Sequence, residues 1–243
     1  MRLLQVSAEL FPLLKTGGLA DVAGALPVAL TAAGEDVRVL LPGFPQIMAG
    51  VTDGAPVAEL RAPWGETVRL LLGRIALPAA PAGERRREGA ASSRAPARFP
   101  TCFDAAADGM TALHAYVVDA PSLYDRPGNP YEDSQRRPYA DNHHRFALLG
   151  WVAAQLADGL DVDWRPEVVH AHDWHAGLAP AYIALSPPND APRVASVFTV
   201  HNLAYQGLFP RSHFAGLGLP DNAFDIHGVE YYGQLSFMKA GLH

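Results

Sequence analysis

The stretch Lys15-Thr16-Gly17-Gly18-Leu19-Ala20-Asp21 decides the fold. It follows a short apolar strand at residues 3–8 and opens an apolar pattern with the period of a helix, which ends at Gly34. A second apolar run at residues 37–41 comes next, so that strand, helix and strand form a β–α–β unit. Such units favour a parallel sheet with helices on both faces.

The same turn has the features of an anion site. Two adjacent glycines let the backbone approach a ligand closely, and the first amides of a helix carry partial positive charge. Lys15 adds a full positive charge beside them. The turn therefore predicts a phosphate-like ligand at Gly17 and Gly18, although a tight strand-to-helix loop with an exposed lysine fits the pattern equally well.

Strands and helices keep alternating along the chain. The expected strands lie at residues 67–72 and 74–77, paired as a hairpin, and at residues 113–118, 168–171 and 194–200. The expected helices lie at residues 146–156, ended by Gly159, and at residues 174–185, and Pro27 should kink the first helix or mark a late start. The pattern predicts a doubly wound, Rossmann-like α/β domain, whose ligands bind at the carboxyl ends of its strands.

Residues 78–108 break this pattern, because Pro, Ala, Gly, Ser and Arg dominate and large apolar side chains are few. Such a segment buries too little surface to offset the entropy lost on ordering, so we expect a disordered, mobile insertion. The alternative is a basic arm around Arg85-Arg86-Arg87 that grips an acidic partner.

Composition limits the possible functions. With 243 residues, 49% of them hydrophobic, the chain can bury a substantial core. Its net charge of −6 argues against a nucleic-acid partner, and it has no apolar run of ~18 residues that would span a membrane. The single cysteine, Cys102, excludes an intramolecular disulfide and fits a reducing cytoplasm.

Three groups of polar residues follow expected strand ends, at residues 15–21, 172–175 and 201–202. They should share one rim of the sheet, and we expect the loop that carries Tyr131 to reach the same rim. The run His170-Ala171-His172-Asp173-Trp174-His175 also invites a metal-dependent hydrolase reading, although its aspartate sits one place early for that pattern. The other alternative is that these histidines pack and hydrogen-bond at a strand end. No dinucleotide, P-loop or serine-elbow motif occurs.

Three motifs in combination carry a family resemblance: KTGGLADV at residues 15–22, HAHDWHAGL at residues 170–178 and TVHNLAYQG at residues 199–207. With them, nearly the whole chain resembles the N-terminal half of bacterial glycogen synthases and plant starch synthases of the ADP-glucose type. The resemblance implies a glycosyltransferase with two Rossmann domains (GT-B) that transfers glucose, with retention, from ADP-glucose to the non-reducing end of an α-1,4-glucan such as glycogen. It implies neither a metal nor another cofactor.

The resemblance also implies roles for particular residues. His201 would lie beside the transferred glucose, and Lys15 would act in catalysis by stabilising the departing ADP together with the Gly17 and Gly18 amides. The remaining implied substrate-binding residues are Tyr131 in the glucose pocket, Asp21, Asp173 and His175 on the acceptor side, Asn202 on the sugar, and Glu9 as a further candidate.

The resemblance further implies that residues 1–243 form one catalytic N-terminal domain, since the family continues into a second, nucleotide-binding domain. We therefore expect the 243-residue chain to be inactive alone, or, as the alternative, to be a non-catalytic glucan-binding remnant. A last helix, expected from near Gln234, would leave Phe237, Met238 and Leu242 uncovered and promote self-association.

Overall fold

The computed structural model describes residues 1–79, 105–106, 110–186 and 192–242. Most of the expected insertion at residues 78–108 lies outside the described residues. At its approximate start, Pro78 still pairs with Met110 inside the main sheet. Ala105–Ala106 likewise form a short strand, β5, against the same neighbour.

An eight-stranded sheet forms the centre of the domain, in the order β3-β4-β6-β2-β1-β7-β8, with β5 beside β6. Its other strands are β1 (Arg2–Val6), β2 (Asp36–Pro42), β3 (Thr52–Arg61), β4 (Thr67–Pro78), β6 (Met110–Asp119), β7 (Val168–His172) and β8 (Ala195–Thr199). The five neighbouring strands β6, β2, β1, β7 and β8 are parallel. On the other side of β6, strands β3, β4 and β5 add antiparallel pairs. This arrangement confirms the predicted doubly wound, Rossmann-like fold.

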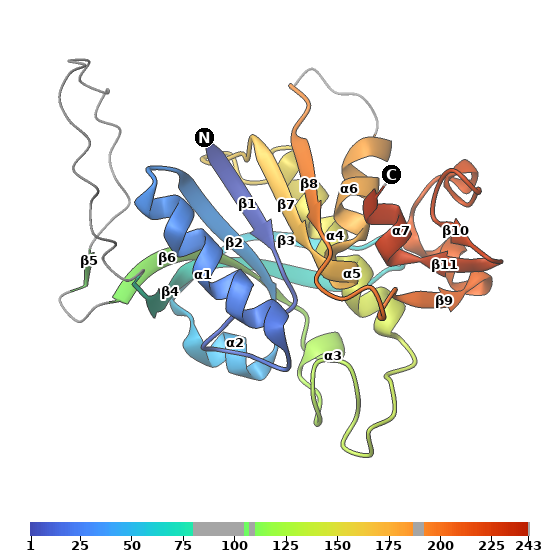
Figure 1. Ribbon diagram of the computed structural model, residues 1–243, viewed down its shortest axis with the longest axis horizontal. Helices are drawn as coiled ribbons and strands as arrows, with labels where there is room; N and C mark the ends of the chain where they lie inside the picture. Colours follow the sequence, from blue (N-terminus) through green and yellow to red (C-terminus); the bar gives the residue numbers. More distant parts are fainter. Residues whose placement is uncertain (80–104, 107–109, 187–191, 243) are drawn as a thin grey trace.

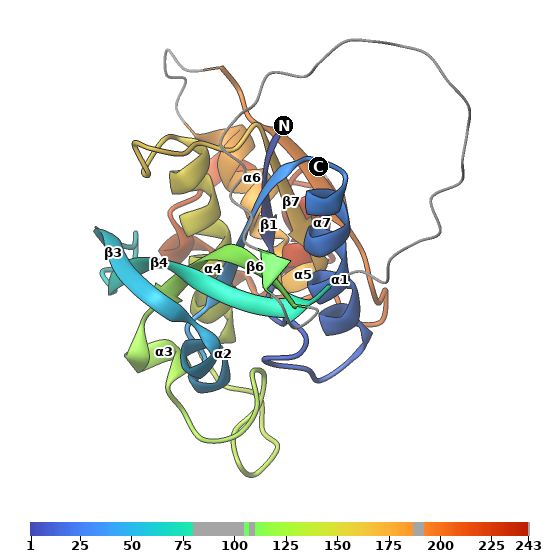
Figure 2. The ribbon, with the colours of Figure 1, turned by 90° about the vertical axis from the view of Figure 1, so that its left-hand side faces the viewer.

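Helices cover both faces of the sheet. They are α1 (Gly18–Ala32), α2 (Pro45–Gly50), α3 (Pro121–Tyr124), α4 (Asn142–Ala157), α5 (Asp173–Ala176), α6 (Leu178–Leu185) and α7 (Phe237–Leu242), with 3-10 turns η1 (Arg211–Leu217) and η2 (Asp221–Ala223). Figure 2 shows α1 and α4 on opposite sides of β1. A small sheet of β9 (Leu208–Pro210), β11 (Gln234–Ser236) and β10 (Glu230–Tyr231) adjoins α7 (Figure 1). Among the described helices, none has the length and apolar character needed to cross a bilayer.

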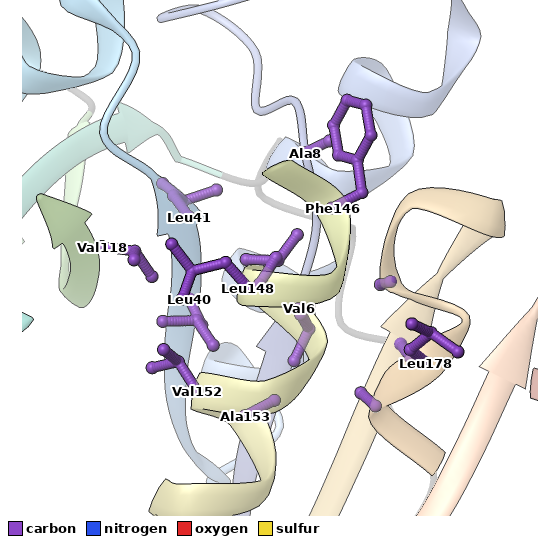
Figure 3. Packing of buried hydrophobic residues seen from close by; sticks show 14 of the residues in the cluster. Val6, Ala8, Leu40, Leu41, Val118, Phe146, Leu148, Val152, Ala153 and Leu178 are labelled. Atoms are coloured by element: carbon purple, nitrogen blue, oxygen red, sulfur yellow. The ribbon is translucent and has the colours of Figure 1, made fainter. Parts of the chain in front are cut away.

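The core lies between α4 and the middle strands. Figure 3 shows Leu148 and Val152 of α4 over Leu40 of β2 and Val6 of β1, and all four side chains are fully buried. Burying each such side chain contributes about 1.5 to 3 kcal/mol. Packing against α4 therefore holds β1 and β2 in place. The segments that follow the carboxyl ends of the parallel strands form the rim of the sheet.

Helix α1 runs through Pro27, so this proline does not mark a late start. A proline inside a helix removes the hydrogen bond to the carbonyl four residues earlier, here that of Ala23. The side-chain amide of Gln5 in β1 donates to this carbonyl at 2.7 Å. Because a buried strand amide replaces the missing donor, the helix continues to Ala32.

Two expected boundaries are wrong because glycines have other roles. The predicted hairpin at residues 67–77 is the single strand β4, and Gly73 lies where β3 comes close: a Cβ there would be 2.8 Å from the Thr52 carbonyl oxygen. The predicted helix at residues 174–185 is divided into α5 and α6 at Gly177. Pro180 falls in the first turn of α6, where proline is tolerated.

The predicted uncovered face of the last helix is also largely wrong. Gln234 begins strand β11, and the helix starts at Phe237. Phe237 and Met238 are buried, with the Phe237 ring 4.9 Å from that of Phe209, whereas Leu242 is 64% exposed. Helices α5 and α6 pack against this helix, and Phe209 of the small sheet adds a ring contact, cover that the sequence pattern did not reveal.

Candidate functional site

The carboxyl ends of three neighbouring strands form the rim on which the site stands. β1 lies between β2 and β7, and β7 pairs in parallel with β8, so that His172 is opposite Thr199. The segments after these strands therefore leave the sheet on the same side. This confirms the expected common rim for residues 15–21, 172–175 and 201–202.

A buried carboxylate organises the turn before α1. Glu9 accepts hydrogen bonds from the Thr16 backbone amide at 2.6 Å, from the Thr16 hydroxyl at 2.5 Å and, at 3.4 Å, from the Gly17 amide. Its side chain is almost fully buried. The Thr16 amide is thus already occupied, and the turn is held at its start by Glu9 rather than by a ligand.

The space over the two glycines is open. A Cβ on Gly17 or on Gly18 would meet no atom within 4 Å, and neither glycine has a positive φ. Packing and a positive φ therefore do not require glycine here, although Gly17 is the N-cap of α1, where glycine is common. The open space is what the expected close approach of a ligand to the helix start needs.

Lys15 lies beside this open space and is paired with Asp21. Its ammonium group donates to both carboxylate oxygens of Asp21 at 2.7 Å, and the two side chains are 45% and 51% exposed. A solvent-exposed pair of this kind contributes little to stability. Lys15 can therefore exchange Asp21 for a stronger anion at small cost to the fold.

The loop that carries Tyr131 reaches the rim, as expected. Its hydroxyl donates to Glu9, and its ring stacks on His175 with centroids 4.9 Å apart and planes 28° apart. Burial, and then the Glu9 carboxylate, raise the pKa of Tyr131 well above its usual value. The phenol therefore remains a hydrogen-bond donor at neutral pH.

Asp173 directly follows β7 in an unusual backbone conformation, and His175 lies two residues further on in α5. Asp173 has a φ of +60°, which is uncommon for a residue other than glycine, although aspartate tolerates it better than most. Its Oδ1 accepts from the Trp174 amide at 2.9 Å, and burial raises its pKa. Burial lowers the pKa of His175 to about 3, so this imidazole is neutral, and its Nδ1 is buried with no partner among the described residues.

His201 is linked to β7 through a second histidine. Its Nε2 lies 2.9 Å from Nδ1 of His172, which is completely buried. The neighbouring His170 lies with its Nε2 2.7 Å from the Thr199 hydroxyl. These contacts correspond to the alternative in which the histidines hydrogen-bond at a strand end, and no group of three potential ligands among the described residues is arranged to hold a metal.

Asn202 lies on the same rim but has a local role in this structure. It is exposed, and its Oδ1 accepts from the Ala204 amide at 2.9 Å. The structure therefore brings together Lys15 with Asp21, and Tyr131 with His175, and places Asn202 at the edge of the group.

The comparison with family models decides the family. Residues 2–243 match the model of the starch synthase catalytic domain. The chain belongs to the starch synthase catalytic domain family. Its relatives include glycogen synthases of Variovorax paradoxus, 62% identical over 245 residues, and Leptothrix cholodnii, 52% identical over 248 residues. All of this chain aligns in both, but it spans only 43% and 44% of their lengths.

A solved starch synthase has the same fold. The catalytic domain of starch synthase IV from Arabidopsis thaliana, bound to ADP and acarbose, aligns with a TM-score of 0.69 over 99% of this chain and 43% of its own. At 20% identity the match supports the architecture alone. It agrees with the GT-B type of fold implied by the sequence resemblance.

Sequence reasoning did not foresee the contacts of two residues that shape the site. Glu9 was expected as a further binding candidate, and in the structure it joins the Thr16 amide to the Tyr131 hydroxyl. His172 was expected either as a metal ligand or as a histidine that hydrogen-bonds at a strand end, and its partner proves to be His201. The sequence signal for Glu9 was a charged residue directly after an apolar strand, which indicates a buried carboxylate with fixed partners.

Proposed function

We propose that this chain provides one side of the active site of an ADP-glucose-dependent α-1,4-glucan glucosyltransferase, a glycogen synthase. Glucose would pass from ADP-glucose to the non-reducing end of the glucan with retention of configuration. The family match and the glycogen synthase names of the relatives support this proposal. The names of the ligands in the plant structure, ADP and acarbose, are consistent with a nucleotide donor and a glucan-like acceptor.

The observation that carries the proposal is the open space over Gly17 and Gly18 beside Lys15. As the bond to glucose breaks, negative charge grows on the departing diphosphate. Helix-start amides and an ammonium group that can leave Asp21 would stabilise that charge where it develops. Such groups lower the barrier most when they are already in place before the reaction.

The rest of the rim supplies groups for the sugars. In this proposal His201 hydrogen-bonds the transferred glucose, Tyr131 lines the same pocket, and Asn202 helps to hold the sugar. Asp173 and His175 face the acceptor glucan. Asp21 lines the acceptor side with them once Lys15 has left it to bind the diphosphate. A carboxylate pair spaced for a covalent glycosyl intermediate, as in retaining glycosidases, is not required.

We further propose that residues 1–243 act as a single domain that works with a second, nucleotide-binding domain. More than half of each relative's length has no counterpart in this chain. Contacts to the adenosine would come from that additional sequence, so the 243-residue chain alone should not transfer glucose. The single cysteine, Cys102, supports placing the enzyme in the reducing cytoplasm.

The test measures transfer of labelled glucose from ADP-glucose to glycogen. Two proteins are compared: the 243-residue chain, and the same chain joined to the remaining sequence of the Variovorax paradoxus glycogen synthase. We expect transfer by the joined protein only, with its loss in the Lys15→Ala and His201→Ala variants. Transfer by the chain alone would refute the two-domain proposal, and a folded but inactive joined protein would refute the function.

A further inference from the structure

The ring of His172 has one partner and one unpartnered nitrogen. Its Nδ1 lies 2.9 Å from Nε2 of His201, and its Nε2 is buried with no hydrogen-bond partner among the described residues. The side chain is completely buried. Burial, with smaller effects from His170 and His201, lowers the pKa of His172 to about 3, so at neutral pH the ring carries one proton.

That proton has two possible positions with different consequences. On Nε2 it would be a buried N–H group without an acceptor, and such orphaned donors are rare because their lost hydration is not replaced. On Nδ1 it would point to His201 Nε2 and form the 2.9 Å hydrogen bond, leaving only an unused lone pair at Nε2. The arrangement therefore favours the Nδ1–H form of His172.

The position of the proton on His172 determines which ring nitrogen of His201 carries a proton. If His172 donates, Nε2 of His201 must accept and carry no proton. A neutral His201 then has its proton on Nδ1, because the hydrogen bond at one ring nitrogen sets the form of the other. The partly exposed ring of His201 would thus offer an N–H donor, not a lone pair, to a bound ligand.

We propose that His172 is a positioning residue that holds His201 in its Nδ1–H form, so that His201 donates a hydrogen bond to an oxygen of the bound sugar nucleotide. The part that concerns the ligand rests on the proposed function, whereas the proton positions do not. His170 has no such part: its Nε2 contacts the Thr199 hydroxyl, although its ring lies only 4.2 Å from that of His172.

The first test needs no substrate. Long-range nitrogen–proton NMR correlations of the chain labelled with ¹⁵N-histidine show which ring nitrogens carry protons at neutral pH. We expect protons on Nδ1 of both His172 and His201. A proton on Nε2 of His201 in the unmodified chain would overturn the proposal.

Variants separate positioning from packing. His172→Asn keeps an N–H donor near the Nδ1 position and should preserve the Nδ1–H form of His201, whereas His172→Phe fills the space without a donor and should release His201 to a mixture of forms. His170→Phe is the matched control on the same strand and should leave the His201 spectrum unchanged. A preserved His201 form in folded His172→Phe would contradict the proposal, and the spectrum of the unmodified chain decides it if that variant does not fold.

The second test uses the joined protein described above. We expect His172→Phe to lower kcat about tenfold, equivalent to about 1.4 kcal/mol, with partial recovery in His172→Asn. Equal kcat values for His172→Phe and the unmodified enzyme would refute the catalytic consequence. If no protein transfers glucose while the NMR result holds, the proposed function fails and the role of His172 in setting the His201 proton stands.

Discussion

The hydroxyl of Tyr131 donates a hydrogen bond to the carboxylate of Glu9, across 122 residues of chain. The same carboxylate holds the amide and the hydroxyl of Thr16. One buried side chain thereby fixes the long loop to the turn before α1. The sugar side and the phosphate side of the proposed site are thus mechanically connected through Glu9.

Breaking this connection should cost measurable stability. Because hydrogen bonds to a charged group contribute about 1.5 to 3 kcal/mol, Glu9→Gln should lower the free energy of unfolding by about 2 kcal/mol, and Tyr131→Phe by about 1 kcal/mol. The double variant should lose less than the sum, since both changes remove the same contact. Urea unfolding measures these values. The control is Tyr139→Phe, because the Tyr139 hydroxyl donates to the Pro127 carbonyl and not to Glu9. Its loss of stability should add fully to that of Glu9→Gln.

Lys15 should matter for transfer but not for folding. Because its pair with Asp21 is about half exposed, Lys15→Ala should change the free energy of unfolding by less than about 1 kcal/mol. In the joined protein we expect kcat to fall about 100-fold, as for loss of one preorganised charge-stabilising group. Arg137→Ala, which removes another exposed ion pair, with Asp133, is the matched control and should leave kcat unchanged. A large loss of stability in Lys15→Ala would contradict this assignment.

Two glycine-to-alanine changes should have opposite effects. A Cβ on Gly177 would lie 2.1 Å from the Phe237 carbonyl oxygen, so Gly177→Ala should destabilise the fold by about 1 to 3 kcal/mol. A Cβ on Gly17 meets nothing, so Gly17→Ala should cost at most about 1 kcal/mol, from the poorer N-cap, but weaken ADP binding to the joined protein. Urea unfolding and calorimetric titration with ADP measure the two effects. Unchanged ADP affinity in Gly17→Ala would place the anion elsewhere.

Acid should destabilise the domain through its neutral buried histidines. The pKa values of His172 and His175 are lowered to about 3, mainly by burial, and that of His143 to about 4. Below about pH 6.5 the unfolded chain binds protons at these positions while the folded chain does not. Stability therefore falls as pH falls, by up to about 1.4 kcal/mol per pH unit for each histidine.

Urea unfolding between pH 6.5 and 5 measures this slope while most carboxylates remain ionised. A folded His175→Gln variant should show a smaller slope than the unmodified chain. The exposed His227→Gln variant is the control and should keep the slope of the unmodified chain. A stability that does not change over this range would show that these histidines are protonated in the folded state.

The apolar periodicity predicted the parallel strands and the common rim because each strand and helix carries its own pattern. It could not predict the interactions between distant residues. Nothing near Pro27 reveals that Gln5 of β1 donates to the Ala23 carbonyl, so the local pattern left open whether the proline marks a late start of the helix. Gly73 looked like a turn residue, whereas it makes room for Thr52 of a neighbouring strand.

In the candidate site, too, local patterns could be predicted from the sequence and contacts between distant residues could not. Residues 15–21 and 172–175 were found because motifs lie next to strand ends, which local sequence reveals. The hydrogen bond between His172 and His201 joins residues 29 positions apart, and the Tyr131 contact depends on the path of a long loop. Packing of Phe237 under the small sheet likewise depends on strand β9, about 30 residues earlier in the chain.

The central place of β1 has a consequence for how the chain folds as it leaves the ribosome. Leu3 pairs on one side with Val37, soon after synthesis begins, but on the other side with Val168. At about 5 to 20 residues per second, the second neighbour is made roughly 7 to 26 seconds later. During that interval one edge of the first strand stays open to other chains, so the nascent polypeptide needs protection long before the rim formed by β1, β7 and β8 can exist.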